Sequence, residues 1–285
     1  MRLLVTGGSS FVGAHFCRRA ATGHHVLALH HQTPLALNGV TPVRCDLRHP
    51  AAVERLRGLR ADAVVHLACK AIGNPEQLTA VNRRLMDVVL ALELPVVYAS
   101  STVVHWPGDT TYGRCRKEDE ERLAAAGVPW VTVRPAAPYG PRLKEHTTGH
   151  TESFHTLASF VRSSPFVPIM GDGQVLRQPL HVHDFADAML ALLERGLPDA
   201  AFDAGGSQVL TMDAVIDTLA QALGTRPAKL HLPAGLFQRL AGLVGDLDDE
   251  LTAAFGTDDT VDHRPLEQAS GVRLRPFSEG AGDLR

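Results

Sequence analysis

The sequence contains few cysteines and no long apolar run. Its four cysteines, Cys17, Cys45, Cys69 and Cys115, are scattered along the chain. No pair has the CxxC spacing of a zinc knuckle, and the set lacks the clustering of a disulfide framework. We therefore expect free thiols in a cytoplasmic protein. No apolar stretch approaches the ~20 residues that a bilayer span requires, so we expect no membrane partner. The first predicted strand begins at Arg2 or Leu3, so we also expect no signal peptide.

A strong charge of either sign is also lacking. The 285 residues carry a formal net charge of −3 at pH 7, without the basic footprint that is typical of nucleic-acid binding. We therefore expect a small-molecule substrate and no nucleic acid. Hydrophobic residues make up 45% of the chain, enough for one large domain or for a large domain with a smaller appendage.

The first 135 residues alternate short apolar runs with helical patterns, which is typical of parallel β-α-β units. Continuous apolar stretches such as ADAVVHLA indicate strands that are buried on both faces. The predicted strands are Leu3–Thr6, His25–Leu29, Thr41–Arg44, Ala63–Ala68, Val96–Ser100 and Trp130–Arg134. The predicted helices between them are Phe11–Thr22, Ala51–Leu59, Gln77–Leu92 and Tyr112–Ala126.

Beyond Pro135 the chain becomes rich in proline, glycine and histidine up to residue 180. Further helices are predicted at Ser153–Arg162, Asp184–Glu194, Met212–Leu223, Gly235–Leu243 and Asp249–Phe255, the second of them capped by Asp184. The predicted fold is α/β, with a Rossmann doubly wound parallel sheet in residues 1–135. Residues 177–204 are expected to return to that sheet, and residues 136–285 otherwise form a smaller substrate-binding lobe.

The strongest local signal is the segment VTGGSSFVGAHF near the start of the chain. A strand ends at Thr6, and a helix opens with Phe11 and Val12. Gly7 allows a tight turn and Gly13 lets helix and strand pack closely, so that backbone N–H groups at the helix start face a pyrophosphate. The segment resembles the TGxxGxxG fingerprint of the short-chain dehydrogenase/reductase superfamily, with Ser10 in place of the middle glycine. Cofactor contacts are expected from Gly7, Ser10, Phe11, Val12 and Gly13.

The end of the second strand indicates which nicotinamide cofactor is used. An NAD enzyme places an acidic residue there to accept the ribose 2′-OH, whereas this chain has His30 and His31. Because an imidazole does not repel a 2′-phosphate, NADP(H) is favoured over NAD(H). The resemblance further implies cofactor contacts from Asp46, whose family counterpart meets the adenine, and from Leu47, Leu67, Ala68 and Pro135.

Two further segments resemble the catalytic part of the family. YASSTVVH matches the end of the fifth strand and YGRCRKEDEERL matches YGxSKxxxE, so the resemblance implies that Ser101, Tyr112 and residue 116 are catalytic and that the last two also contact the cofactor. Tyr112 and residue 116 lie on one helix face because four residues turn ~400°. Residue 116 is Arg116 rather than lysine: it keeps the charge but never gives up its proton. Lys117 points ~140° away from Tyr112 around the helix, too far to take the place of the family lysine. A non-catalytic NAD(P)-binding regulatory protein stays an alternative.

The second half carries further family-like motifs. VRPAAPYGPR resembles RPxxxYGP, PIMGDGQVLRQPLHVHDFADA resembles PxxGDGxxxRxxxHVxD, and LEQASGVRLRPFSEG resembles the closing ALGWxPxxxxEG. The resemblance implies substrate contacts from Thr102, Tyr139 and Arg177. His181 and His183 are expected to orient strand and turn.

A cluster of histidines raises the question of a metal site. His146 and His150 are four apart, which suits a metal pair on a helix, and His155 follows with Glu145 and Glu152 nearby. The intervening Thr147, Thr148 and Gly149 are poor helix formers. We therefore favour a mobile substrate loop and expect no metal.

Taken together, the motifs resemble those of an extended short-chain dehydrogenase/reductase of the NAD-dependent epimerase/dehydratase family. Family dehydratases carry an Asp-Glu pair after the catalytic residue, where this chain has Thr102 and Val103, so a dehydratase is disfavoured. The expected activity is reduction of a nucleotide-linked sugar by a 4-ketoreductase, with an epimerase holding tightly bound NAD as the alternative. The family also implies a homodimer formed through the Tyr112 helix.

Overall fold

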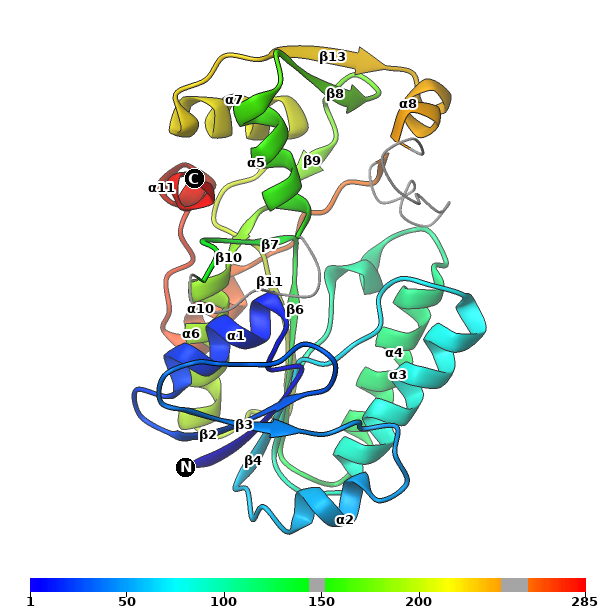
Figure 1. Cartoon of the computed structure of the whole chain (residues 1–285), viewed down its shortest axis with the longest axis vertical. Coiled ribbons are helices and arrows are strands. Elements are labelled where there is room, and N and C mark those ends of the chain that lie inside the picture. Colours follow the sequence, from blue (N-terminus) through cyan, green and yellow to red (C-terminus); the bar gives the residue numbers. More distant parts are fainter. Residues whose placement is uncertain (144–151, 242–255) are drawn as a thin grey trace.

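The computed structural model describes residues 1–143, 152–241 and 256–285. Its centre is a seven-stranded parallel sheet with the order β11-β6-β5-β4-β1-β2-β3 (Figure 1). The strands are β1 Arg2–Thr6, β2 His25–His30, β3 Val40–Arg44, β4 Ala63–His66, β5 Val96–Ala99, β6 Trp130–Pro135 and β11 Ala200–Ala204. The order reverses between β1 and β4, which is the switch point where Rossmann folds bind ligands. The predicted doubly wound α/β fold is confirmed.

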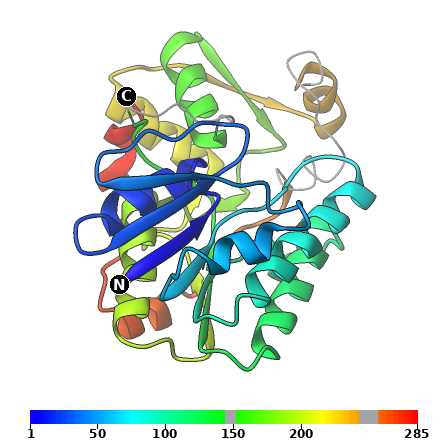
Figure 2. The same ribbon diagram turned by 60° about the horizontal axis from the view of Figure 1, so that its bottom comes forward.

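Helices cover both faces of this sheet (Figures 1 and 2). On one face α1 (Phe11–Ala20) packs against α6 (Val182–Glu194). On the other face lie α2 (Ala52–Arg57), α3 (Pro75–Leu90) and α4 (Thr111–Ala124). The central strands are therefore buried from both sides, which explains their continuous apolar sequences.

Polar caps set where several elements begin and end. The Asn74 side chain accepts from the N–H of Glu76, and Pro75 stands at the first helical position, so α3 begins two residues earlier than predicted. The strand predicted to reach Ala68 ends at His66. Beyond it the N–H groups of Leu67 and Ala68 both donate to Thr6 Oγ1 at 3.1 Å instead of continuing the strand ladder.

The predicted cap of α6 was wrong. The helix begins at Val182, and its cap is the side chain of His181, whose Nδ1 accepts from the N–H of His183 at 3.2 Å. Asp184 lies inside the first turn, where its carboxylate accepts from the backbone N–H and the guanidinium of Arg275. The acidic side chain therefore holds the C-terminal segment and does not cap the helix.

A second hydrophobic core lies beside the sheet. Tyr139, Phe154, Ile169, Ile216 and Phe277 are among the side chains that form it. The elements around it are β7 Pro138–Tyr139, α5 Ser153–Ser163, β8 Phe166–Met170, β9 Leu176–Arg177, β10 Leu180–His181, β12 Leu210–Thr211, α7 Met212–Leu223, β13 Ala228–Leu232, α8 Ala234–Ala241 and α11 Phe277–Gly280. Two 3₁₀ helices, η1 Thr102–His105 and η2 Ala281–Leu284, and helix α10 Arg264–Ser270 complete the described elements.

Within these elements β11 pairs with β6 and α6 packs on α1, so parts of the second half lie on the main sheet. The helix expected at Asp249–Phe255 lies outside the described residues. In the part of the chain that the structure describes, none of the helices has the length and apolar character needed to cross a membrane.

Candidate active site

The turn after β1 has the geometry of a dinucleotide-binding loop. Gly7 has φ +67°, and a Cβ on it would lie 2.7 Å from the backbone nitrogen of Ala68. A Cβ on Gly13 would collide with the carbonyl oxygen of Gly7. These contacts press the start of α1 against the switch point between β1 and β4, where N–H groups at a helix start bind phosphate. The turn therefore fits a dinucleotide cofactor.

Ser10, which departs from the fingerprint, is the cap of α1. Its Oγ accepts from the N–H of Gly13 at 3.0 Å, and the residue is exposed. Phe11 is buried and Val12 is half-buried behind it. Because a serine hydroxyl satisfies an N–H group at the helix start, the substitution keeps the turn intact and adds a polar group beside the phosphate position.

The residues expected near the adenosine meet at the ends of β2 and β3. Strand pairing places His30 beside Arg44, and His31 Nε2 lies 3.5 Å from Asp46 Oδ2. Both Asp46 oxygens accept from the Arg48 guanidinium at 2.9 Å, which lowers the pKa of Asp46 to about 2. Leu47 is buried beside them.

Tyr112 stands in the first turn of α4. The Thr110 hydroxyl caps this helix by accepting from the N–H of Gly113 at 3.0 Å. The Tyr112 hydroxyl lies 4.0 Å from Cys69 Sγ, on the segment that follows β4. Burial and the neighbouring Cys69 raise the pKa of Tyr112, and the charge of Arg116 acts in the opposite direction. Tyr112 therefore stays protonated at neutral pH, as a proton donor must.

Arg116 is buried beneath Tyr112. Only 1% of the residue is exposed, and its Cζ lies 5.0 Å from the ring centre of Tyr112 and 5.5 Å from that of Tyr98. Its Nη2 donates to Asn82 Oδ1 at 3.1 Å and lies 3.8 Å from Asp119 Oδ2. Aromatic faces attract a guanidinium. The site thus has a fixed positive charge against the tyrosine ring, while Lys117 is exposed.

Asp119 is the carboxylate nearest to this buried cation. It is 3% exposed and accepts from the Tyr98 hydroxyl at 3.1 Å. Burial raises its pKa to about 6, although Arg116 and the Tyr98 hydrogen bond lower it. At neutral pH Asp119 therefore carries the negative charge that a buried guanidinium requires.

Ser101 and Thr102 follow β5 and face different surroundings. Ser101 is half-buried, and its Oγ accepts from the N–H of Val103 at 3.3 Å, which starts η1 beside α4. Thr102 is only 2% exposed and donates to the carbonyl of Pro135 at 3.3 Å. The Thr102 hydroxyl thus joins β5 to β6 inside the protein, and a substrate contact from Thr102 stays a prediction.

The two expected substrate residues of the second half also make internal contacts. Tyr139 is fully buried, with its ring centre 5.1 Å from that of His181 and 4.9 Å from that of Phe277. Tyr139 therefore belongs to the second hydrophobic core, and its expected substrate contact stays a prediction. Arg177 is half-buried and its Nη1 donates to the carbonyls of Leu176 and Thr257 at 3.0 and 2.5 Å.

Of the histidines considered for a metal, His146 and His150 lie outside the described residues, as does Glu145. His155 is buried in α5, and its Nε2 is 2.9 Å from the carbonyl oxygen of Gly140. The ring of His155 also packs against Phe11 at the start of α1. His155 thus contacts the phosphate-binding helix.

Sequence reasoning missed Asn82, Tyr98, Asp119 and Cys69. Asn82 is 1% exposed and binds the backbone of Lys70 through both amide atoms as well as Arg116. Asn82 stands on the apolar face of α3, four residues after Leu78 and four before Met86. A polar residue at such a position is a signal that could have identified it, since buried amides need partners. Cys69, Tyr98 and Asp119 carry no comparable signal, because they meet Tyr112 and Arg116 from three different segments.

Comparisons with known proteins agree with this geometry. The model of the NAD dependent epimerase/dehydratase family matches residues 3–205. A dTDP-4-dehydro-6-deoxy-D-allose reductase from Streptomyces sp is 28% identical, covering 85% of this chain and 88% of that protein. A dTDP-glucose 4,6-dehydratase from Streptomyces niveus is 26% identical over 74% of each chain.

Solved structures show the same fold. A UDP-glucose 4-epimerase from Thermus thermophilus in complex with NAD has a TM-score of 0.77 at 23% identity, covering 100% of this chain and 97% of that one. The UDP-glucose 4-epimerase from Bifidobacterium longum, with NAD⁺ and UDP, has a TM-score of 0.79 at 19% identity and the same coverage.

Proposed function

Because the chain belongs to the NAD-dependent epimerase/dehydratase family, we propose that it is a 4-ketoreductase that acts on a nucleotide-linked sugar. The observation that carries this proposal is Tyr112 held over the buried Arg116 guanidinium, close to a dinucleotide-binding turn. The similarity to a dTDP-sugar reductase over 85% of the chain supports the same activity.

The residues after Ser101 favour a reductase over a dehydratase. Eliminating water from a sugar calls for an acid and a base beside the substrate, and this chain has Thr102 and Val103 at those places. The Thr102 hydroxyl is already bonded to the carbonyl of Pro135. Neither place therefore has a carboxylate to act as acid or base in an elimination. A reduction needs only a proton donor and a bound hydride source, so these residues favour a reductase.

In the proposed mechanism, residues Gly7 and Ser10 to Gly13 hold a nicotinamide dinucleotide at the start of α1. When bound, this cofactor supplies the hydride. Tyr112 donates its hydroxyl proton to the sugar oxygen, and Ser101 Oγ–H holds that oxygen in place. Arg116 then stabilises the tyrosinate as a fixed charge, because arginine keeps its proton at any working pH. Solvent returns the proton to Tyr112.

We propose NADP(H) as the preferred cofactor. His30 and His31 stand where an NAD enzyme presents a carboxylate. Burial and the charge of Arg44 lower the pKa of His30, so this ring is neutral at physiological pH. A neutral imidazole does not repel the 2′-phosphate of NADP(H) as a carboxylate would. The four unpaired cysteines support a reducing, cytoplasmic compartment.

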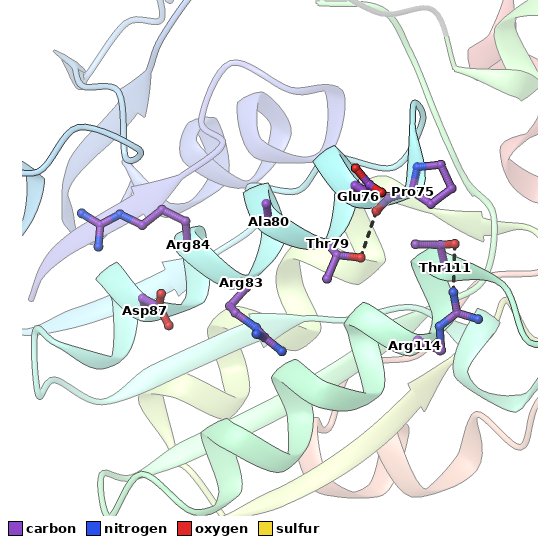
Figure 3. A pocket seen from close by; sticks show the side chains of 9 residues that line it. All are labelled: Pro75, Glu76, Thr79, Ala80, Arg83, Arg84, Asp87, Thr111 and Arg114. Carbon is purple, nitrogen blue, oxygen red and sulfur yellow. Dashed lines mark hydrogen bonds between the residues drawn. The ribbon is translucent and has the colours of Figure 1, made fainter.

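We also propose a homodimer formed through α3 and α4, whose outer face is polar. Figure 3 shows Arg83, Arg84 and Arg114 around a shallow pocket that also includes Glu76 and Asp87. Arg83 pairs with Glu118 at 2.6 Å on the same face. Among the described residues, neither helix exposes a large hydrophobic side chain. Such a dimer would therefore be held by ion pairs and polar contacts.

The function is tested by mixing the purified protein with NADPH and a dTDP-linked 4-keto-6-deoxy sugar. Oxidation of one NADPH per sugar reduced is the expected result. A protein that retains NAD on purification, and that interconverts UDP-sugars without net oxidation, would be the epimerase instead. Binding of NADPH without reduction of the sugar would identify a non-catalytic NAD(P)-binding protein, and failure to bind either nucleotide would contradict the enzyme assignment.

A further inference from the structure

A pocket of about 450 Å³ lies at the carboxyl ends of β2 and β3. It is lined by His31, Arg44, Cys45, Asp46, His49, Ala51, Ala52 and Arg55. The pocket adjoins the dinucleotide-binding turn, because the N–H of Gly8 donates to the carbonyl of Leu29 in β2 at 2.9 Å. The N–H of Cys45 in turn donates to the carbonyl of His30 at 2.8 Å.

This position matches the adenosine half of a dinucleotide. A dinucleotide in a Rossmann fold places its pyrophosphate at the start of the first helix and its adenosine over the second strand. In this chain the first helix is α1, and Tyr112 and Arg116 lie on the other side of the switch point, beyond β4. A dinucleotide bound in this way would place the ribose next to the adenine at the end of β2, beside the pocket.

The pocket carries positive charge that no carboxylate neutralises. Within residues 1–143, 152–241 and 256–285, neither the Arg44 nor the Arg55 guanidinium has a hydrogen-bond or ion-pair partner. The carboxylate that lines the pocket, Asp46, already receives two bonds from the Arg48 guanidinium and one from the Arg48 N–H at 3.0 Å. Asp46 is thus paired with Arg48, and not with Arg44 or Arg55.

Two unpartnered guanidinium groups at one hollow favour a phosphate ligand. Arginine matches phosphate oxygens with its planar fork and is the preferred residue for such contacts. A ribose 2′-OH would instead call for a free carboxylate acceptor, and both oxygens of Asp46 already accept from the Arg48 guanidinium. The imidazoles of His31 and His49 add two further groups able to donate hydrogen bonds to an anion.

We propose that Arg44 and Arg55 bind the 2′-phosphate of NADP(H), with His31 and His49 beside them, and that this pair sets the cofactor specificity. The inference rests on the proposed function only in requiring a nicotinamide dinucleotide in the turn at Gly7. It assigns the specificity to β3 and α2, in addition to the end of β2 where the sequence placed it.

The test is a fluorescence titration with NADPH and with NADH of the wild type, Arg44→Ala, Arg55→Ala and the double variant. Each single variant is expected to weaken NADPH binding at least 10-fold while NADH affinity changes less than 2-fold. Arg57→Ala is the matched control, because Arg57 is on the same helix but donates to the carbonyl of Ala91 at 2.7 Å. It should leave both affinities unchanged.

A second pair of probes isolates the phosphate. Binding of 2′,5′-ADP to the wild type should exceed that of 5′-AMP, and the difference should disappear in the double variant. A wild type that prefers NADH, or variants that weaken NADPH and NADH equally, would overturn the assignment. These titrations use no sugar, so they test the site independently of turnover. A protein that binds NADPH through both arginines but reduces no ketone in the turnover assay would contradict the proposed function and leave this site intact.

Discussion

The guanidinium carbon of Arg116 lies 5.0 Å from the ring centre of Tyr112 and is almost completely enclosed by protein. Lysine, the family residue at this place, can exchange its proton, whereas arginine cannot. Asn82 and Asp119 hold the guanidinium from the side, and Tyr98 holds Asp119. This arrangement explains how the substitution is accommodated: the positive charge stays under the tyrosine, and its counter-charge is built into the same helix.

Two replacements of Arg116 test how much its positive charge contributes to stability and to activity. Arg116→Met leaves the Asp119 carboxylate buried without a cation, and we expect a loss of about 3–5 kcal/mol in the free energy of unfolding. Arg116→Lys keeps the charge and should lose less. Urea unfolding measures these changes in the free energy of unfolding.

The same two variants test the role of the charge in catalysis. In NADPH-dependent turnover, Arg116→Lys should retain more activity than Arg116→Met. Equal turnover in the wild type and Arg116→Met would contradict the role given to this charge.

Cys69 should be the thiol through which the site is inactivated. It is exposed, whereas Cys17, Cys45 and Cys115 are buried. Because Cys69 Sγ lies 4.0 Å from the Tyr112 hydroxyl, iodoacetamide should label this residue first and block turnover. Bound NADPH should slow the labelling. Mass spectrometry identifies the adduct, and Cys69→Ala provides an active, resistant control. Stoichiometric labelling of Cys69 with full retained activity would place it outside the site.

Acid should destabilise the contact between α1 and α6. His15 Nδ1 and His183 Nε2 are 3.1 Å apart, and His15 Nε2 is 2.9 Å from the carbonyl oxygen of Pro141. Burial lowers the pKa of each ring to about 4, with Coulombic repulsion from His181 adding to the effect in both; His15 also faces Arg18, and His183 faces Arg19.

The sign of this effect follows from the unfolded value of about 6.5. The unfolded chain binds protons on these two rings more tightly than the folded chain does. The stability that the neutral rings give is therefore fully present above pH 6.5 and is lost as pH falls from 6.5 to 4. Each ring changes the free energy of unfolding by at most about 3 kcal/mol over this range. Urea unfolding between pH 8 and pH 4 should show this slope, and His183→Gln should flatten it. An identical slope in that variant would assign the acid sensitivity to other groups.

The polar face of α3 and α4 predicts a dimer that depends on salt. Screening weakens ion pairs between exposed groups, so sedimentation at 50 mM and 500 mM NaCl should show dissociation at the higher concentration. Arg83→Glu should weaken the dimer at both concentrations, because it places a second negative charge beside Glu118 on that face. A dimer indifferent to salt, or a monomer at low salt, would refute this interface.

Much of the fold could be predicted from the sequence. The six strands of the first half and their helices were placed within a few residues, because buried parallel strands are continuously apolar and glycines mark the turn. Errors came where a side chain competes with a regular ladder. Thr6 captures two N–H groups after β4, and His181 caps α6 where Asp184 was expected.

The site was only partly accessible from the sequence. The spacing of Tyr112 and Arg116 along one helix was readable, since it follows from helical geometry. Asp119 is also on that helix, but its pairing depends on Tyr98 in β5. Arg44 and Arg55 line one pocket although they come from β3 and α2. Burial of Thr102 and Tyr139 depends on contacts with distant segments, so it could not be predicted from their motif positions alone.

The most direct test of the account compares the wild type with Tyr112→Phe in NADPH-dependent reduction of a dTDP-linked 4-keto-6-deoxy sugar. The variant lacks the proton donor, so kcat should fall at least ~100-fold. NADPH affinity should stay within about 2-fold, because the ring that covers Arg116 is kept. An undiminished kcat in Tyr112→Phe would contradict the central claim that this tyrosine delivers the proton.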